Sequence, residues 1–266
     1  MEKPSVWGKL YLALILFLLY LPILVVAAYS FNAASSGAQW TGFTLSWYKK
    51  LLEEGKYTQP LLHSIELGLL SAFLAGVIGT AAALSAATRA FKTKGVFESL
   101  SMLPIMIPEI ILGISFMSMF ALVGLRGGML PLVLAHTTFC IPYVYIIVKG
   151  RIRDLDPSVI EAARTLGATK IRAFLTVTLP IILPAVLSGC LLSFAMSFDD
   201  VIISSYLRGP TSELLPTKIY AALKLGVTPD VNALFTLILG VMLLLVATMA
   251  VTLQIRKILQ RKVDAQ

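Results

Sequence analysis

The sequence has little charge and few of the residues that build disulfide or metal sites. Only 14% of its 266 residues are charged, whereas soluble domains carry about 25%. The two cysteines, Cys140 and Cys190, lie inside apolar stretches far apart in the chain. They are therefore expected to be small buried residues and not a disulfide pair. There are only two histidines, which gives no basis for a metal site, and His136 is expected to be a hydrogen-bonded interior residue.

The sequence also contains no GxxxxGK[ST] phosphate-binding loop. The chain is therefore expected to have no nucleotide cofactor of its own, and any ATP and Mg must belong to a partner. The net charge of +8 could suggest nucleic acid. The basic residues lie between apolar runs, however, as in membrane proteins, so no nucleic-acid partner is expected.

Long hydrophobic runs are the dominant feature of the chain. Hydrophobic residues make up 58% of the sequence, and the mean hydropathy is +0.86. A membrane span needs roughly 20 such residues, and lipid favours helices because backbone groups must be satisfied internally. We therefore expect an all-α integral membrane protein with one transmembrane domain over residues 1–266. The six expected spans cover residues 10–29, 62–88, 99–123, 129–148, 180–205 and 232–254.

The first apolar run is longer than the 7–15 residues of a secretory signal core, so a retained span is predicted. With both termini in the cytoplasm, inside segments hold 15 Lys and Arg residues and outside segments hold 7. This bias predicts cytoplasmic termini. The outside loop 30–61 contains an amphipathic stretch, LSWYKKLLEE, and the outside loop 206–231 is rich in turn residues. Small residues recur every fourth position in span 62–88, which predicts close helix packing.

The largest inside loop, residues 149–179, has strong helix signals. Asp156 followed by Pro157 predicts a helix start, and Gly167 is placed to end that helix in the left-handed conformation. Thr169 can cap a second helix that leads to Pro180. The first helix has small and apolar residues such as Ile160, which fits either docking into a groove of another protein or packing on the chain's own spans.

Seven residues of this loop resemble the EAA loop of membrane subunits of binding-protein-dependent ABC importers: Glu161, Ala162, Ala163, Gly167, Val177, Leu179 and Pro180. Val177 replaces the family's usual isoleucine. The resemblance implies a type I ABC importer permease fold in a bacterial inner membrane. It also implies that residues 157–167 form a coupling helix, with Glu161 as polar anchor.

The same resemblance implies several partners. These are a homologous second permease subunit that makes a heterodimer, two copies of a cytoplasmic ATPase and an extracytoplasmic binding protein. The chain would be a transport subunit, with ATP hydrolysis on the separate partner. Four longer segments resemble the membrane subunits of spermidine/putrescine importers: WTGFTLSWYKKLL, PEIILGISF, SFDDVIISSYLRGP and LLPTKIYAALKLGVTPDVNAL.

The expected spans contain acids and no Lys or Arg. Glu109 follows Pro104 and Pro108, which predict a kinked or unwound helix. Asp199 and Asp200 lie in span 180–205. Ionisable groups at such depth are candidates for a substrate pathway, and carboxylates suit a polyamine cation. Interhelical hydrogen bonding is the alternative role.

Helical spacing separates the two aspartates. One polar stripe is expected to follow span 180–205 and to carry Gly189, Ser193, Ser197, Asp200 and Ser204. This spacing places Asp200, with Ser197, on a cavity face and rotates Asp199 by about 100° from it. Trp47, in the first outside loop, can contact substrate or receptor, or anchor at the membrane interface.

Two other functions stay open from the sequence. A permease for another solute could use the same scaffold, but an anion path should carry buried Arg or Lys. A proton-coupled secondary transporter could use the acids as proton relays, and no inverted repeat is evident in the sequence. We therefore expect an ATP-driven polyamine importer subunit.

Overall fold

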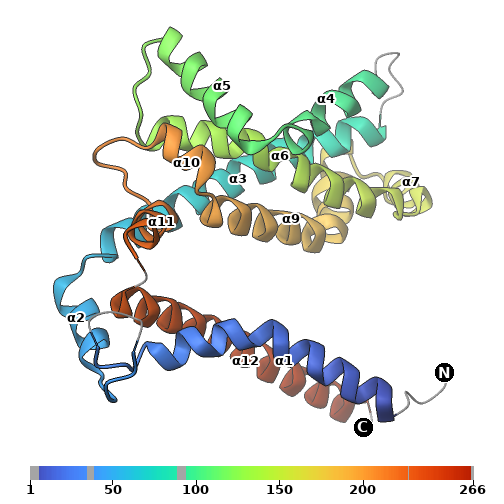
Figure 1. Ribbon diagram of the computed structural model, residues 1–266. Helices are drawn as coiled ribbons and strands as arrows, with labels where there is room; N and C mark the ends of the chain where they lie inside the picture. Colours follow the sequence, from blue (N-terminus) through green and yellow to red (C-terminus); the bar gives the residue numbers. More distant parts are fainter. Residues whose placement is uncertain (1–5, 35–38, 89–93, 227, 265–266) are drawn as a thin grey trace. The chain divides into compact units, whose positions relative to one another are not determined.

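The computed structural model describes residues 6–34, 39–88, 94–226 and 228–264, and every regular element within these ranges is helical. The chain divides into two compact units (Figure 1). The larger unit runs from Tyr57 to Tyr220. The smaller unit combines the two ends of the chain, Met1–Lys56 and Ala221–Gln266.

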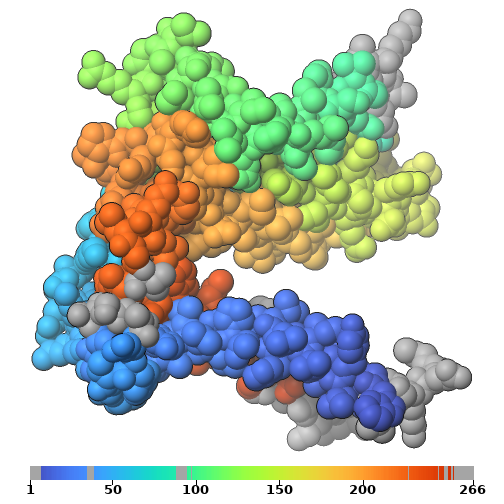
Figure 2. Space-filling model, in the orientation of Figure 1, coloured from blue at the N-terminus to red at the C-terminus, as the bar shows by residue number. Residues whose placement is uncertain are grey.

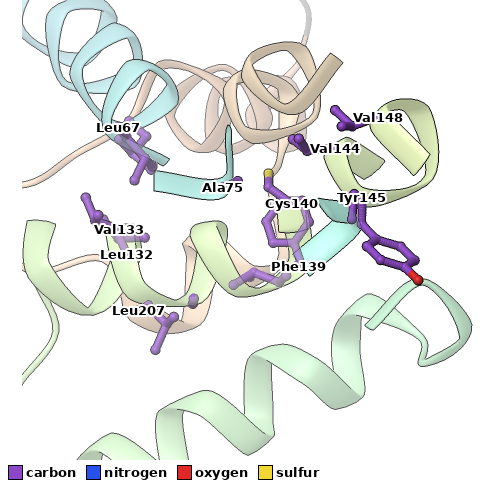
Figure 3. Close-up of a cluster of buried hydrophobic side chains, with 14 of the residues drawn as sticks. Leu67, Ala75, Leu132, Val133, Phe139, Cys140, Val144, Tyr145, Val148 and Leu207 are labelled. Atoms are coloured by element: carbon purple, nitrogen blue, oxygen red, sulfur yellow. The ribbon is translucent and has the colours of Figure 1, made fainter. Parts of the chain in front are cut away.

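The core of the larger unit is built by α3 (Thr58–Thr88), α6 (Met129–Arg153) and α9 (Leu179–Asp199), which pack against one another. Figure 3 shows the buried side chains between them, among them Leu67 and Ala75 of α3 and Leu132 and Val144 of α6. Cys140 is fully buried in this cluster, and both cysteines are free thiols. The prediction of small buried cysteines is confirmed for Cys140, whereas Cys190 is half-buried.

The small residues of α3 allow the close packing that the sequence predicts. A Cβ added at Gly76 would lie 2.5 Å from Sγ of Cys190. A Cβ at Gly79 would lie 2.8 Å from Cβ of Val144 and 3.0 Å from the backbone oxygen of Ile141. Both glycines therefore set the distance from α3 to its neighbours.

This contact gives a test of the core. Gly79→Ala is expected to destabilise the protein by about 1–3 kcal/mol, because the added methyl group must displace α6 backbone. The control is Gly150→Ala on α6, where a Cβ meets nothing within 4 Å. Alanine is the better helix former by about 1 kcal/mol, so this change should be neutral or stabilising. Equal melting temperatures of the two purified variants in detergent would contradict this account.

The third expected span is two helices and not one. Helix α4 (Lys94–Met106) and helix α5 (Glu109–Leu122) meet at a bend of 106°. The pair forms a V in Figure 1 and two diverging ridges in Figure 2. Pro108 stands directly before α5 with an extended backbone. The break predicted from Pro104 and Pro108 is confirmed, and it places Glu109 at the first residue of a new helix.

Five helical elements follow α6 and precede α11 (Leu215–Leu225). They are α7 (Pro157–Thr165), α8 (Lys170–Ala173), the π-helix η1 (Phe174–Thr178), then α9, and finally α10 (Ile202–Leu207). The expected span 180–205 is wrong at its C-terminal end. Helix α9 stops at Asp199, because Asp200 has an extended backbone that cannot continue a helix.

Helix α11 (Leu215–Leu225) lies in the region for which the sequence predicted an outside loop with turns. Its start is attached to α3. The backbone N–H of Leu215 donates to Oγ of Ser64 at 2.9 Å, and a ring nitrogen of His63 lies 3.1 Å from the backbone oxygen of Glu213.

The smaller unit consists of α1 (Val6–Tyr29), α2 (Ser46–Glu54) and α12 (Pro229–Asp264), with α12 in contact with both α1 and α2. The amphipathic helix predicted in the first outside loop is confirmed as α2. Its surface carries the ion pairs Lys49–Glu53 and Lys50–Glu54. Gly55 ends the helix in the left-handed conformation.

Five helical segments within the described ranges are long and apolar enough to cross a membrane, and the α4–α5 pair makes a sixth if it counts as one span. The expected all-α fold with six spans agrees with this result. The break in the third segment and the early end of the fifth place Glu109, Asp199 and Asp200 at helix ends, where sequence patterns placed them inside spans.

Candidate functional site: two helix breaks that carry acids

Three acidic side chains of the larger unit lie at two helix breaks. Glu109 is the first residue of α5, Asp199 is the last residue of α9, and Asp200 connects α9 to α10. Helices α5 and α10 pack against each other. The carboxylates of Asp199 and Asp200 are close enough to interact electrostatically with Glu109. The structure thus brings together three predicted pathway acids from positions 90 residues apart.

The two aspartates differ sharply in exposure. Asp200 is 9% exposed, whereas Asp199 and Glu109 are exposed. Oδ1 of Asp200 accepts the backbone N–H of Ile203 at 3.2 Å, and Oδ2 accepts that of Ser204 at 2.7 Å. Asp200 therefore satisfies two N–H groups at the start of α10, as a helix-capping carboxylate does.

His136 of α6 completes a buried network around Asp200. Its Nε2 lies 3.5 Å from Oδ2 of Asp200 and 3.2 Å from Oγ of Ser204. Its Nδ1 lies 2.8 Å from Oγ of Ser197. All four side chains are buried, and His136 is completely so. The prediction of a hydrogen-bonded interior histidine is confirmed.

The predicted cavity face is wrong in this chain. The residues expected to form it, Gly189, Ser193, Ser197, Asp200 and Ser204, are all buried. Gly189 lies close to the backbone of Val144: a Cβ added at Gly189 would be 3.1 Å from Cα of Val144. Oγ of Ser193 donates to the backbone oxygen of Cys140. The small polar side chains thus attach α9 to α6, and the exposed acid is Asp199.

Trp47, the predicted aromatic site residue, belongs to the smaller unit. Its indole Nε1 donates to the backbone oxygen of Asn32 at 2.8 Å, and Nζ of Lys50 lies 5.7 Å from the ring centre. Asn32 in turn binds the loop that returns to α2, since its side-chain nitrogen donates to the oxygen of Gln39 at 2.7 Å. Trp47 therefore fastens the loop between α1 and α2.

The loop with the importer motif has the predicted local structure. Oδ1 of Asp156 accepts the N–H of Ser158 at 2.9 Å, Pro157 begins α7, and Gly167 has φ +90°. The hydrogen bond from Ser158 keeps the pKa of the Asp156 carboxyl below its ordinary value, so the cap is ionised at neutral pH. Oγ1 of Thr169 accepts the N–H of Arg172, which caps α8 as predicted.

Helix α7 presents an open surface and buries none of its residues. Glu161 and Ala162 are exposed, whereas Ile160 and Ala163 are half-buried where α7 lies against α8 and η1. Beyond the helix, Leu166 is 89% exposed. Exposed apolar side chains beside an exposed acid are typical of a surface that another protein covers.

Leu179 and Pro180, the last two residues of the motif, are the first two of α9. Leu179 is half-buried against the core of the larger unit, and Pro180 is exposed, two residues after the π-helix η1. The motif therefore joins an exposed helix to the start of the helix that ends at Asp199.

Two functional side chains were missed by sequence reasoning. His136 was expected in the interior but not as the centre of a network at the α9–α10 break. Tyr143 of α6, to which sequence reasoning assigned no function, is half-buried on the same helix as His136. The spacing of four residues between His136 and Cys140 places both on one face of a helix. No signal in the neighbouring sequence, however, indicates which helix packs against that face.

An apolar helical bundle with broken helices, acids at the breaks and an exposed motif helix defines a membrane transport subunit. Sequence comparison gives the family. Residues 75–265 match the binding-protein-dependent transport system inner membrane component, and the chain belongs to this family.

Individual relatives extend over most of the chain. The spermidine/putrescine transport system permease protein PotC of Haemophilus influenzae is 38% identical over 228 residues, covering 86% of this chain and 89% of that protein. The putrescine transport system permease protein PotI of Escherichia coli K12 is 37% identical over 243 residues, covering 89% of this chain and 86% of that protein.

Solved structures support the fold. A chain of a bacterial ABC transporter for the acidic polysaccharide alginate has a TM-score of 0.73 at 14% identity, covering 94% of this chain and 99% of that chain. The MetNI methionine ABC transporter has a TM-score of 0.60 at 19% identity, covering 78% and 95%. At these identities the likeness concerns the fold, and the different solutes leave specificity to the side chains.

Proposed function

We propose that the protein is a permease subunit of an ATP-driven importer that carries polyamines, spermidine or putrescine, into the cytoplasm. The observation that carries the proposal is the convergence of Glu109, Asp199 and Asp200 at two facing helix breaks. Relatives named for spermidine and putrescine transport support the choice of solute. A cation that sheds water needs carboxylates to replace its hydration.

The assembly in this proposal has four kinds of component. A homologous second permease closes the pathway beside this chain, two copies of an ATPase bind below, and an extracytoplasmic binding protein delivers the solute above. ATP and Mg belong to the ATPase, because this sequence has no phosphate-binding loop. The subunit lies in a bacterial inner membrane with both termini in the cytoplasm, as the distribution of Lys and Arg favours.

Helix α7 is the proposed docking element for the ATPase. Glu161 is its polar anchor, Ala162 and Ala163 allow close approach, and Gly167 ends the helix. ATP binding favours the outward-facing state, and hydrolysis returns the pathway to the inside. Each ligand drives its step only by binding one state better than the other.

The proposal predicts ATP-dependent uptake of labelled spermidine or putrescine into vesicles with the permease pair, the ATPase and the binding protein. Uptake should persist when an uncoupler abolishes the proton gradient and should stop when ATP is omitted. Uptake that survives loss of the ATPase and collapses with the uncoupler would favour a proton-coupled transporter instead. Uptake of an uncharged or anionic solute, with none of either polyamine, would overturn the polyamine assignment.

A further inference from the structure

The two adjacent aspartates are built into the chain in different ways. Both carboxylate oxygens of Asp200 accept backbone N–H groups of α10, and the side chain is 4% exposed. Asp199 is exposed, and among the described residues no hydrogen bond or ion pair holds its carboxylate. The two neighbouring aspartates thus differ: the carboxylate of Asp200 is held by hydrogen bonds within the protein, and that of Asp199 is available to a ligand.

His136 attaches both sides of the α9–α10 break to α6. Ser197, on its Nδ1 side, is in the last turn of α9, and Ser204, on its Nε2 side, is in α10. Asp200 lies between the two serines along the chain and faces Nε2. With Nε2 protonated, the imidazole donates to Oγ of Ser204 and accepts the hydroxyl of Ser197, and the same Nε2 faces Oδ2 of Asp200 at 3.5 Å. One histidine therefore satisfies groups on both sides of the break.

A carboxylate whose oxygens already accept hydrogen bonds within the protein is a poor ligand for a cation in transport. If Asp200 turned toward a solute, the backbone N–H groups of Ile203 and Ser204 would lose their acceptor in a buried place. Unsatisfied buried polar groups are costly. Asp199 is exposed at the end of α9 and can meet a cation without breaking any such bond.

We propose that Asp199 is the solute-contacting acid of this pair, and that Asp200 and His136 are positioning residues that fix the α9–α10 break and so hold Asp199 exposed at the end of α9. The proposal rests on the proposed polyamine transport and divides its site into two roles. It reverses the ranking of the aspartates that helical spacing suggested.

The matched variants Asp199→Asn and Asp200→Asn test this division in the reconstituted transporter. Asp199→Asn should raise the KM for spermidine by about tenfold or more, the loss of one charge-assisted contact, with Vmax nearly unchanged. Asp200→Asn keeps one acceptor oxygen, so it should lower Vmax and the melting temperature while KM stays within about twofold. His136→Ala should resemble Asp200→Asn.

Coupling between residues gives a second readout that involves no solute. The double variant His136→Ala/Asp200→Asn should lose less melting temperature than the two single losses combined, because both remove the same contact. The combination His136→Ala/Asp199→Asn should be additive. If Asp200→Asn fails to assemble, Ser204→Ala serves in its place, since it removes a hydroxyl from His136 and leaves both acids.

The outcomes separate this inference from the proposed function. An equal rise of KM in Asp199→Asn and Asp200→Asn would overturn the division of roles, as would additive melting losses for His136 and Asp200. Absence of polyamine uptake by the unmodified transporter would overturn the proposed solute. In that case the melting temperatures would still decide whether His136 and Asp200 act as one unit.

Discussion

Glu161→Lys is expected to abolish ATP-driven uptake while the permease itself stays folded. Helix α7 buries no residue and Glu161 is exposed, so the change should alter the free energy of unfolding by only about 0.5 kcal/mol or less. At an interface that desolvates this carboxylate, a reversed charge should weaken ATPase binding by about 2–5 kcal/mol. Co-purification of the ATPase with the permease and uptake in vesicles measure the two effects.

Two control variants make this result specific. Glu161→Gln keeps the shape of the side chain and should retain partial binding of the ATPase. Asp154→Lys makes the same change of charge in the same loop, at the exposed residue that follows α6. It should leave uptake nearly normal. Full transport by Glu161→Lys, or equal losses in Glu161→Lys and Asp154→Lys, would show that α7 is not the docking element.

Gly209→Ala is expected to have the second large effect, at the contact between the α5–α6 loop and the loop after α10 in the larger unit. The loop between α5 and α6 touches the loop after α10 backbone to backbone. A Cβ at Gly209 would lie inside van der Waals contact with the oxygen of Gly127 and 2.9 Å from its carbonyl carbon. The N–H of Gly128 also donates to the oxygen of Leu207 at 2.9 Å. Separation of these loops should cost about 2–4 kcal/mol of stability, at the upper end for overpacking.

Gly128→Ala is the matched control for this contact. Gly128 has φ 161°, an extended backbone that any residue adopts, and a Cβ there meets nothing within 4 Å. Thermal unfolding of the purified complex should show a large loss for Gly209→Ala and almost none for Gly128→Ala. If both variants have the same melting temperature as the unmodified protein, the contact between the two loops contributes little to stability.

Local signals in the sequence predicted the motif loop almost to the residue. The start of α7 follows from Asp156 and Pro157, and its end from Gly167, because capping depends on residues within one turn. The expected coupling helix covered residues 157–167, and the structure has a helix at Pro157–Thr165. Helix α2 was found in the same way, from the amphipathic stretch LSWYKKLLEE.

The breaks that carry the acids were harder to predict, since prolines alone do not identify them. Pro142 and Pro184 lie inside α6 and α9 without ending either helix. The chain does break at Pro108, and it breaks at Asp200 with no proline nearby. The second break depends on His136, 64 positions earlier in the chain. A pattern along one helix cannot reveal such a partner, so the polar stripe was read as continuous through Ser204.

The same reason explains the misplaced cavity face. Serines and glycine spaced by three and four residues predict a shared face of α9, and they do share one. Whether that face meets water or another helix depends on α6, whose Val144 and Cys140 lie against it. Spacing identified the face correctly and its environment incorrectly.

The π-helix η1 has a mechanical consequence for the path between the motif and the acids. Residues Lys170–Asp199 run as one helical segment of 30 residues, which at 1.5 Å per residue is a rod of about 45 Å. The π-helix η1 lies near the N-terminal end of this segment and contains wide turns with i→i+5 bonds. Conversion of such a turn to α-geometry would rotate one part of the rod against the other by about 100° per residue displaced. A change of geometry in η1, beside α7, would therefore rotate Asp199 about the helix axis without bending the helical segment between them.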